Sequence, residues 1–335
     1  MTQTRVRLFL IAAILYVGSV YSMCDLGRSK ETKLRPIPSP AYTYEDGNKP
    51  SDKAYRFSFF NRQRKLAVLM YPGNRLWVMD DQFRREREIK IDDELLHVSI
   101  APDDNSFLLR GRHGMYLSRS GRIFRFPIKK ASDYLGVCSD SSTVVLAGTT
   151  DIKQVKCSMP TKVTDVVTGR KADYHGVSAV CISPDHRYFA IGGFNYLEVW
   201  DTEKWRLLKK IVGKWNITGG GVREGDWVNS VAFSSDGKLL AATGSLSTVM
   251  LNTANWKQAD HLKGLLSCGA YQVDFVKPDK LILLNPSDIS EYSTVTGKLV
   301  GRVDVEGIVD MHVSPFDGTV ATSDIAGRIF TWSGF

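Results

Sequence analysis

The alternation of apolar and polar residues along this chain repeats as a phrase with a period of about 40 residues. One copy spans 177–211 and reads VSAVCISPDHRYFAIGGFNYLEVWDTEKWRLLKKI; a second spans 228–262 and reads VNSVAFSSDGKLLAATGSLSTVMLNTANWKQADHL. Each copy has four short apolar runs of strand type, separated by turn residues, and lacks helical spacing. Because a unit of this size cannot bury a core alone, we expect an array of stacked β units.

The same order of strand and turn signals recurs at seven places. Apolar character declines from the first strand of each unit to the fourth, as expected if the first lines a crowded centre and the fourth meets solvent. The first strands lie near Phe57, Val98, Gly136, Ala179, Ser230, Val273 and Met311. The sequence therefore predicts an all-β fold, a seven-bladed β-propeller with four-stranded antiparallel blades.

The last unit shows signals for three strands only, up to residue 335. Three strands would leave an open ring and an exposed sheet edge, both of which are unfavourable. Near the start of the chain, SPAYTYEDG (39–47) alternates tyrosine with threonine between Pro40 and Gly47, which is typical of a short strand. We therefore expect residues 41–45 to form the outer strand of the last blade and to close the ring, so that the propeller spans 41–335.

One unit contains an intact Trp-Asp dipeptide, Trp200-Asp201. With the repeats, this dipeptide makes the chain resemble the WD-repeat family of β-propellers over about residues 42–335. The resemblance implies a fold rather than one activity. The motifs are degenerate, because the Gly-His pair that usually precedes each first strand is absent and only the reversed pair His175-Gly176 lies nearby. These departures remove residues that the family's Asp-His-Ser-Trp hydrogen-bond network uses.

Residues 1–24 have the pattern of an export leader. Arg5 and Arg7 precede an uncharged run that is short for a membrane-spanning helix and typical of a signal-peptide core. Cleavage after Ser22 would place the mature chain in an extracytoplasmic compartment: periplasm, cell surface or medium. The alternatives are lipoprotein processing at Cys24, which would anchor the chain to a membrane, or an uncleaved anchor. Residues 25–40 contain prolines and mixed charges and are expected to form a linker.

The chain has 44 Lys and Arg residues against 36 Asp and Glu residues, a formal net charge of +8. This excess is concentrated between residues 105 and 132, which contain no acidic residue. Within that segment, Arg119, Arg122 and Arg125 lie close to Tyr116. Because arginine forks suit carboxylates and phosphates, we expect an acidic protein, an anionic membrane or a glycan as partner. Nucleic acid would suit the charge but not export; a solvated outer face is the alternative.

A second distinctive segment is the insertion VGKWNITGGGVREGDW (212–227), which exceeds the repeat period by about ten residues. In a propeller, a connection from a fourth strand to the next first strand lies on the face where the central channel opens. Trp215 and Trp227 flank three glycines here, together with Arg223. Exposed tryptophan and arginine are enriched in interface hot spots, so the loop is a candidate contact site. The alternative is that both tryptophans pack beneath a glycine bend.

No catalytic, metal-binding or cofactor motif stands out. The six histidines are scattered, and no HExxH or paired CxxC motif occurs. Recurrent carboxylates are expected to cap turns after the first strands; they are Asp185, Asp236, Asp279 and Asp317. Cys138, Cys157, Cys181 and Cys268 are expected to stay unpaired, with Cys138 and Cys181 at matching positions of adjacent blades.

We therefore predict an exported, monomeric, non-catalytic platform that binds protein partners. A propeller enzyme or small-ligand binder at the channel mouth is the first alternative, because propeller sites can be assembled from single residues of several blades. The second alternative is a cytosolic WD-repeat scaffold whose leader is misinterpreted. Four unpaired cysteines would fit this second alternative.

Overall fold

The computed structural model describes residues 35–36, 42–44, 53–71, 73–170, 176–212, 227–244, 248–258 and 270–332. The chain divides into two compact units, Met1–Leu34 and Arg35–Phe335, and every described residue belongs to the second. The predicted export leader and Cys24 lie outside the described residues. Within the described residues, no helix has the length and apolar character needed to cross a membrane.

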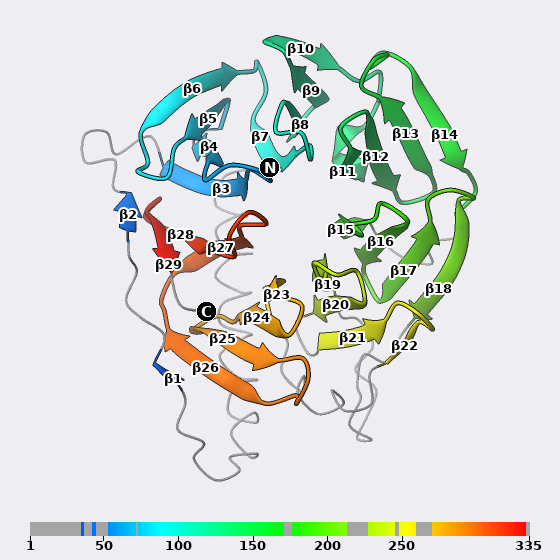
Figure 1. Ribbon diagram of the computed structural model, residues 1–335. Coiled ribbons are helices and arrows are strands. Elements are labelled where there is room, and N and C mark those ends of the chain that lie inside the picture. The colour runs from blue at the N-terminus through cyan, green and yellow to red at the C-terminus, as the bar shows by residue number, and fades with distance from the viewer. Residues whose placement is uncertain are drawn as a thin grey trace, which may run out of the picture. The chain divides into compact units, whose positions relative to one another are not determined.

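Seven antiparallel sheets follow one another in chain order, and each is one blade of the propeller (Figure 1). Blade 1 contains β3 (Lys53–Phe59), β4 (Leu66–Tyr71), β5 (Arg75–Met79) and β6 (Arg85–Lys90). Blade 2 contains β7 (Leu95–Ile100), β8 (Ser106–Gly111), β9 (Met115–Arg119) and β10 (Arg122–Arg125). A short 3-10 helix, η2 (Ala131–Asp133), leads to blade 3, with β11 (Tyr134–Asp140), β12 (Thr143–Gly148), β13 (Ile152–Lys156) and β14 (Val163–Val167).

The remaining blades repeat this plan. Blade 4 contains β15 (Val177–Ile182), β16 (Tyr188–Gly193), β17 (Tyr196–Asp201) and β18 (Arg206–Val212). Blade 5 contains β19 (Val228–Phe233), β20 (Leu239–Gly244), β21 (Thr248–Asn252) and β22 (Lys257–Gln258). Blade 6 contains β23 (Gln272–Lys277), β24 (Lys280–Leu284), β25 (Asp288–Ser293) and β26 (Leu299–Asp304); blade 7 contains β27 (Ile308–Val313), β28 (Val320–Asp324) and β29 (Ile329–Trp332).

An N-terminal strand completes blade 7, as the sequence predicts. The strand β2 (Tyr42–Tyr44) pairs antiparallel with β29, with Tyr42 opposite Thr331 and Tyr44 opposite Ile329. The inner strand β27 of blade 7 contacts β3 of blade 1, so the first and last blades are neighbours (Figure 1). Blade 7 therefore has its fourth strand, and the ring is closed.

A two-residue strand, β1 (Arg35–Pro36), adds a fifth member to the sheet of blade 6. It pairs in parallel with β26, with Arg35 opposite Gly301. The sequence does not predict this pairing, which falls in the segment expected to be a linker. Such a short contact leaves no periodic signal in the chain.

The hydrophobic core consists of separate clusters, each shared by two neighbouring blades. Blades 6 and 7, for example, jointly bury Ile282, Ile289, Met311 and Trp332. Blades 1 and 7 bury a further cluster that includes Phe57 and Ile329. Because each cluster needs both of its blades, the structure confirms that one repeat cannot bury a core alone.

Aspartates cap three of the four predicted turns after the inner strands. Asp185, Asp236 and Asp317 each accept a hydrogen bond from the backbone N–H two residues later, at 3.1 Å. Burial disfavours the three carboxylates, but the hydrogen bonds they accept outweigh it and lower their pKa values; for Asp185 and Asp236 the largest of these come from the hydroxyls of Ser183 and Ser234. The prediction is wrong for Asp279, whose carboxylate makes no such bond among the described residues. The reason is a tighter turn, in which Lys277 pairs directly with Lys280.

Candidate functional site

Five inner strands contain a register shift at the same place, near their beginning. The residue that follows the shift is Arg56 in β3, His97 in β7, Ala179 in β15, Ser230 in β19 and Asp310 in β27. A β-bulge of this kind re-aims the side chains that follow it. The sequence therefore decides blade by blade which chemical group occupies this position, and blades 7, 1 and 2 place charged or titratable groups there.

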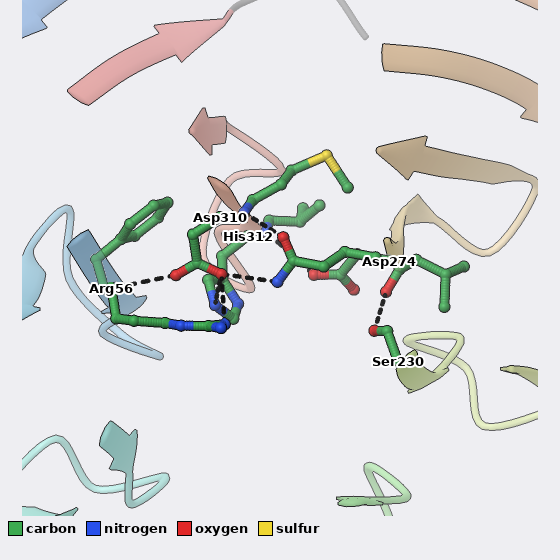
Figure 2. Close-up of polar contacts among 10 residues, drawn as sticks. Arg56, Ser230, Asp274, Asp310 and His312 are labelled. Atoms are coloured by element: carbon green, nitrogen blue, oxygen red, sulfur yellow. Dashed lines mark hydrogen bonds and ion pairs between the residues drawn. The ribbon is translucent and has the colours of Figure 1, made fainter. Parts of the chain in front are cut away.

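Asp310 links three consecutive blades through one carboxylate (Figure 2). It accepts hydrogen bonds from Gln272 Nε2 of blade 6 at 2.7 Å and from Arg56 Nη1 and the Phe57 backbone N–H of blade 1 at 3.3 and 3.2 Å. Its side chain is fully buried. Gln272 Oε1 in turn accepts a hydrogen bond from the Met311 backbone N–H at 2.6 Å.

Similar side-chain contacts tie blade 5 to blade 6 and blade 6 to blade 7 (Figure 2). Ser230 Oγ donates to the carbonyl oxygen of Val273 at 3.4 Å. Asp274 Oδ2 accepts the backbone N–H of Val313 at 3.1 Å. Together with Asp310, these groups form a polar seam, defined as Ser230, Gln272, Asp274, Asp310 and Arg56, along the inner strands of blades 5, 6, 7 and 1.

The seam and its neighbour His312 alter each other's acidity. Burial would raise the pKa of Asp310, but the positive charges of His312 and Arg56 outweigh it and lower the pKa to about 2. Burial lowers the pKa of His312, and the neighbouring Asp310 carboxylate, 3.6 Å from Nε2, more than offsets this and raises it. For Asp274, burial dominates and the pKa is raised. Asp310 is therefore held as a carboxylate, and its negative charge favours the protonated form of His312.

His97 lies beside the seam on blade 2. Burial and the positive charges of Arg56, His312 and Arg110 lower its pKa to about 4, so the imidazole is neutral near pH 7. The acceptor oxygens of Asp310 and Asp274 already have protein donors. Among the described residues, no group of three or more histidines, cysteines or carboxylates has a geometry that would hold a metal ion. The contacts of the seam are thus structural: they hold neighbouring blades together.

The sequence did not single out the seam. A signal was nevertheless present, because Asp310 and His312 interrupt an otherwise apolar first strand, IVDMHV, and Asp274 interrupts QVDFVK. Polar residues in a buried strand need partners. The identity of those partners is not visible in the sequence, since Arg56 and Asp310 are 254 residues apart.

Strand pairing separates the four predicted binding residues of the basic segment into two pairs. Tyr116 lies opposite Arg125, and Arg119 lies opposite Arg122. Because side chains alternate along a strand, Arg122 and Arg125 point to opposite faces of the sheet. Tyr116 is buried and donates its hydroxyl to Asp93 Oδ2 at 2.9 Å. Arg125 lies over the Tyr116 ring, so this pair serves the packing of blade 2.

Arg119 and its neighbours border an open pocket of about 410 Å³ between blades 1 and 2. The pocket is lined by Arg87, Asp103, Asp104, Asn105, Arg119 and Ser120. Arg87 comes from the outer strand of blade 1. The other five residues come from blade 2: Asp103, Asp104 and Asn105 from the turn between β7 and β8, and Arg119 and Ser120 from the end of β9 and the turn after it. Arg122 is exposed on the strand beside Arg119.

Trp227 lies at the end of the predicted insertion, and it combines both interpretations of that segment. Its ring contacts Phe194 with the ring centroids 5.3 Å apart, and 40% of the residue is exposed. Trp215 and Arg223 lie outside the described residues.

Trp227 belongs to a wider set of exposed apolar residues on one face of the ring. All lie at the ends of outer strands, at the beginnings of inner strands, or between the second and third strands, and the antiparallel topology brings these places to the same face. For example, the Ile325 backbone N–H donates to Gly307 just before β27. We call this set the apolar face; it consists of Val212, Trp227, Tyr271, Val309 and Ile325.

Two tryptophans on third strands are fixed by hydrogen bonds of different kinds. Trp332 Nε1 donates to Thr322 Oγ1 on the adjacent strand at 2.9 Å. Trp200 Nε1 donates instead to Glu198 Oε2 at 3.1 Å.

No protein-family model matches the chain, and a search of curated proteins finds no significant match.

Proposed function

We propose that this chain is an exported, non-catalytic β-propeller that binds a separate protein through its apolar face. The observation that carries the proposal is the exposure of large apolar side chains on consecutive blades, from Val212 of blade 4 to Ile325 of blade 7. Single exposed apolar residues are ordinary on protein surfaces, but a row of them on one face is typical of an interaction site. Trp227 and Tyr271 add the aromatic content that is enriched in interface hot spots.

The opposite face provides a comparison. Its exposed large apolar residues are Ile123, Met159, Leu207, Val295 and Phe316, on blades 2, 3, 4, 6 and 7. Met159 and Val295 lie between third and fourth strands, towards the outer rim. Phe316 is the one aromatic residue among these five, whereas the apolar face places Trp227 and Tyr271 before the inner strands of the neighbouring blades 5 and 6. The apolar face is therefore the better candidate for a partner.

The seam supports a non-catalytic role. The Asp310 carboxylate accepts hydrogen bonds from Gln272, Arg56 and the backbone of Phe57, and this leaves it unsuited to act on a substrate. Asp274 likewise accepts backbone N–H groups from Phe275 and Val313. A catalytic acid or base would need a free oxygen within reach of the substrate.

The more specific parts of the proposal come from the sequence. Membership of the WD-repeat family is supported by Trp200-Asp201 and by the Trp332–Thr322 hydrogen bond, which resembles one link of that family's network. Export is supported by the charge and apolar pattern of residues 1–24. The net charge of +8 favours an acidic partner or an anionic membrane or glycan surface in the same compartment.

Two matched triple variants test the protein-binding role. The first replaces Tyr271, Val309 and Ile325 by serine on the apolar face, and the second replaces Met159, Val295 and Phe316 by serine on the opposite face. The tagged full chain is purified from its native source, and co-purifying proteins are quantified against the wild type. We expect the first variant to lose at least one protein that the second retains. An unchanged set of bound proteins in the first variant, or equal losses in both, would contradict the proposal.

A further inference from the structure

We propose that the pocket between blades 1 and 2 binds a phosphorylated polyol, with the phosphate on Arg87 and Arg119. It lies among the turns that join first to second and third to fourth strands, on the face opposite the apolar face. The inference therefore does not depend on the proposed protein-binding role. A volume of about 410 Å³ falls within the range of small-ligand pockets.

The two arginines of the pocket are available donors. Several other arginines among the described residues are paired, for example Arg84 with Asp80 at 2.7 Å and Arg112 with Glu94 at 2.8 Å. Arg87 and Arg119, by contrast, have neither an ion pair nor a side-chain hydrogen bond to any described residue. Planar guanidinium groups bind phosphate oxygens in pairs, so two free forks on one pocket favour a phosphate ligand.

The pocket also contains two carboxylates, Asp103 and Asp104, and they differ in how far they are available to offset the positive charge of the two arginines. Asp104 is buried and accepts hydrogen bonds from the backbone N–H groups of Asn61 and Arg62 at 2.6 and 2.8 Å, and also from Asn61 Nδ2 at 3.1 Å. Asp104 is thus consumed in fixing the turn of blade 1 to the turn of blade 2. This contact builds the pocket wall before any ligand arrives, which reduces the entropic cost of binding.

The remaining polar groups of the pocket indicate which groups the ligand carries besides the phosphate. Asp103 uses Oδ1 to accept the Asn105 backbone N–H at 3.1 Å, and its Oδ2 has no hydrogen-bond donor among the described residues. A carboxylate oxygen that faces a ligand requires a donor such as a hydroxyl group. Asn105 and Ser120 can either donate or accept. A phosphate on the arginines and hydroxyls on Asp103, Asn105 and Ser120 together describe a phosphorylated polyol.

The proposal is tested by calorimetric titration of the full chain at low salt with glycerol 3-phosphate, inorganic phosphate and glycerol. We expect glycerol 3-phosphate to bind more tightly than either fragment. Arg87→Gln and Arg119→Gln should each weaken its binding about tenfold, the equivalent of one lost charged contact. Arg206→Gln, an exposed arginine on blade 4, is the matched control and should bind as the wild type does. Arg119→Lys, which keeps the charge but not the fork, should fall between Arg119→Gln and the wild type.

A polyol phosphate could be a lipid headgroup or a soluble molecule, and vesicle binding distinguishes the two. Flotation with phosphatidylglycerol vesicles, and with phosphatidylcholine vesicles as control, shows whether the polyol phosphate is a lipid headgroup. Vesicle binding that the Arg87→Gln/Arg119→Gln variant loses supports a headgroup ligand, and binding of soluble glycerol 3-phosphate alone supports a soluble one. The proposal is overturned if wild-type protein binds neither probe, or if the double variant binds as tightly as the wild type.

Discussion

The Asp310 carboxylate of the last blade accepts a hydrogen bond from the backbone N–H of Phe57 in the first blade, at 3.2 Å. The ring is thus closed twice, at its inner edge by this contact and at its outer edge by β2 against β29. The two closures use different chemistry: one is a buried charge with backbone and side-chain donors, and the other is an added strand. They can therefore be removed independently.

The outer closure predicts a step in a deletion series. Removal of residues 1–34 should leave the stability of the propeller unchanged, whereas removal of residues 1–47 takes away β2 and exposes the edge of β29. We expect the longer deletion to cost about 2–3 kcal/mol, a fall in Tm of roughly 5 °C for a domain of this size. Calorimetry measures both, and deletion of residues 1–37 separates β1 from β2. Equal Tm values for the deletions at 34 and 47 would show that β2 does not close the ring.

The inner closure predicts a large effect of a small substitution. Asp310→Asn keeps the shape of the side chain but replaces one carboxylate oxygen by an N–H₂ group. This group is a donor and would face the donors of Gln272, Arg56 and the Phe57 backbone, whose hydrogen bonds the carboxylate now accepts. A buried charged network that loses one member in this way should be destabilised by about 3 kcal/mol. Asp304→Asn, on an exposed carboxylate of blade 6, is the control and should change the urea midpoint little. A similar midpoint for both variants would refute the role of Asp310.

His97 predicts how stability depends on pH. Its pKa falls from an ordinary 6.5 to about 4 in the folded protein, so the unfolded chain binds the proton more readily. Stability from His97 is complete above pH 6.5 and is lost as the pH falls towards 4, by on the order of 2 kcal/mol. Asp310 adds a further loss below about pH 4, and His312, whose pKa is raised, contributes in the opposite sense only at higher pH. Urea unfolding at several pH values should show a slope between pH 6.5 and 4 that His97→Gln reduces; an unchanged slope would exclude this residue as its source.

A buried ion pair joins blades 3 and 4. Arg170 Nε lies 3.0 Å from Glu198 Oε2, and both side chains are almost fully buried. Arg170→Met should destabilise the protein by about 3 kcal/mol, because it removes the closest cation from a buried carboxylate. The double variant Arg170→Met/Glu198→Leu should recover much of this loss. If the double variant is less stable than Arg170→Met alone, Glu198 is stabilised without Arg170.

The blade plan could be predicted because it is written locally. Apolar runs, Ser-Asp-Gly turns and the shortened last unit all lie within one repeat length, and the pattern at 39–47 matched the strand that was missing. The pairing of Arg35–Pro36 with β26 could not, since two residues carry no period. The caps at Asp185 and Asp236 followed from turn chemistry, and Asp279 failed because its turn is shorter.

The candidate sites were predicted less well, because they are made between blades. The sequence groups Arg119, Arg122 and Arg125 as neighbours, but strand alternation sends Arg125 to the other face with Tyr116. The partner that Arg119 does have across the pocket, Arg87, belongs to the preceding blade. The seam has the same origin, since Arg56 and Asp310 become neighbours only when the ring closes.

Site-specific photo-crosslinking tests the proposed function most directly. A photoreactive phenylalanine analogue is placed at Ile325, 71% exposed on the apolar face, and separately at Phe316, 51% exposed on the opposite face. After irradiation in the native host, we expect position 325 to form a covalent adduct with a distinct protein and position 316 to form none. Adducts of equal yield at both positions, or no adduct at 325, would contradict a partner on the apolar face.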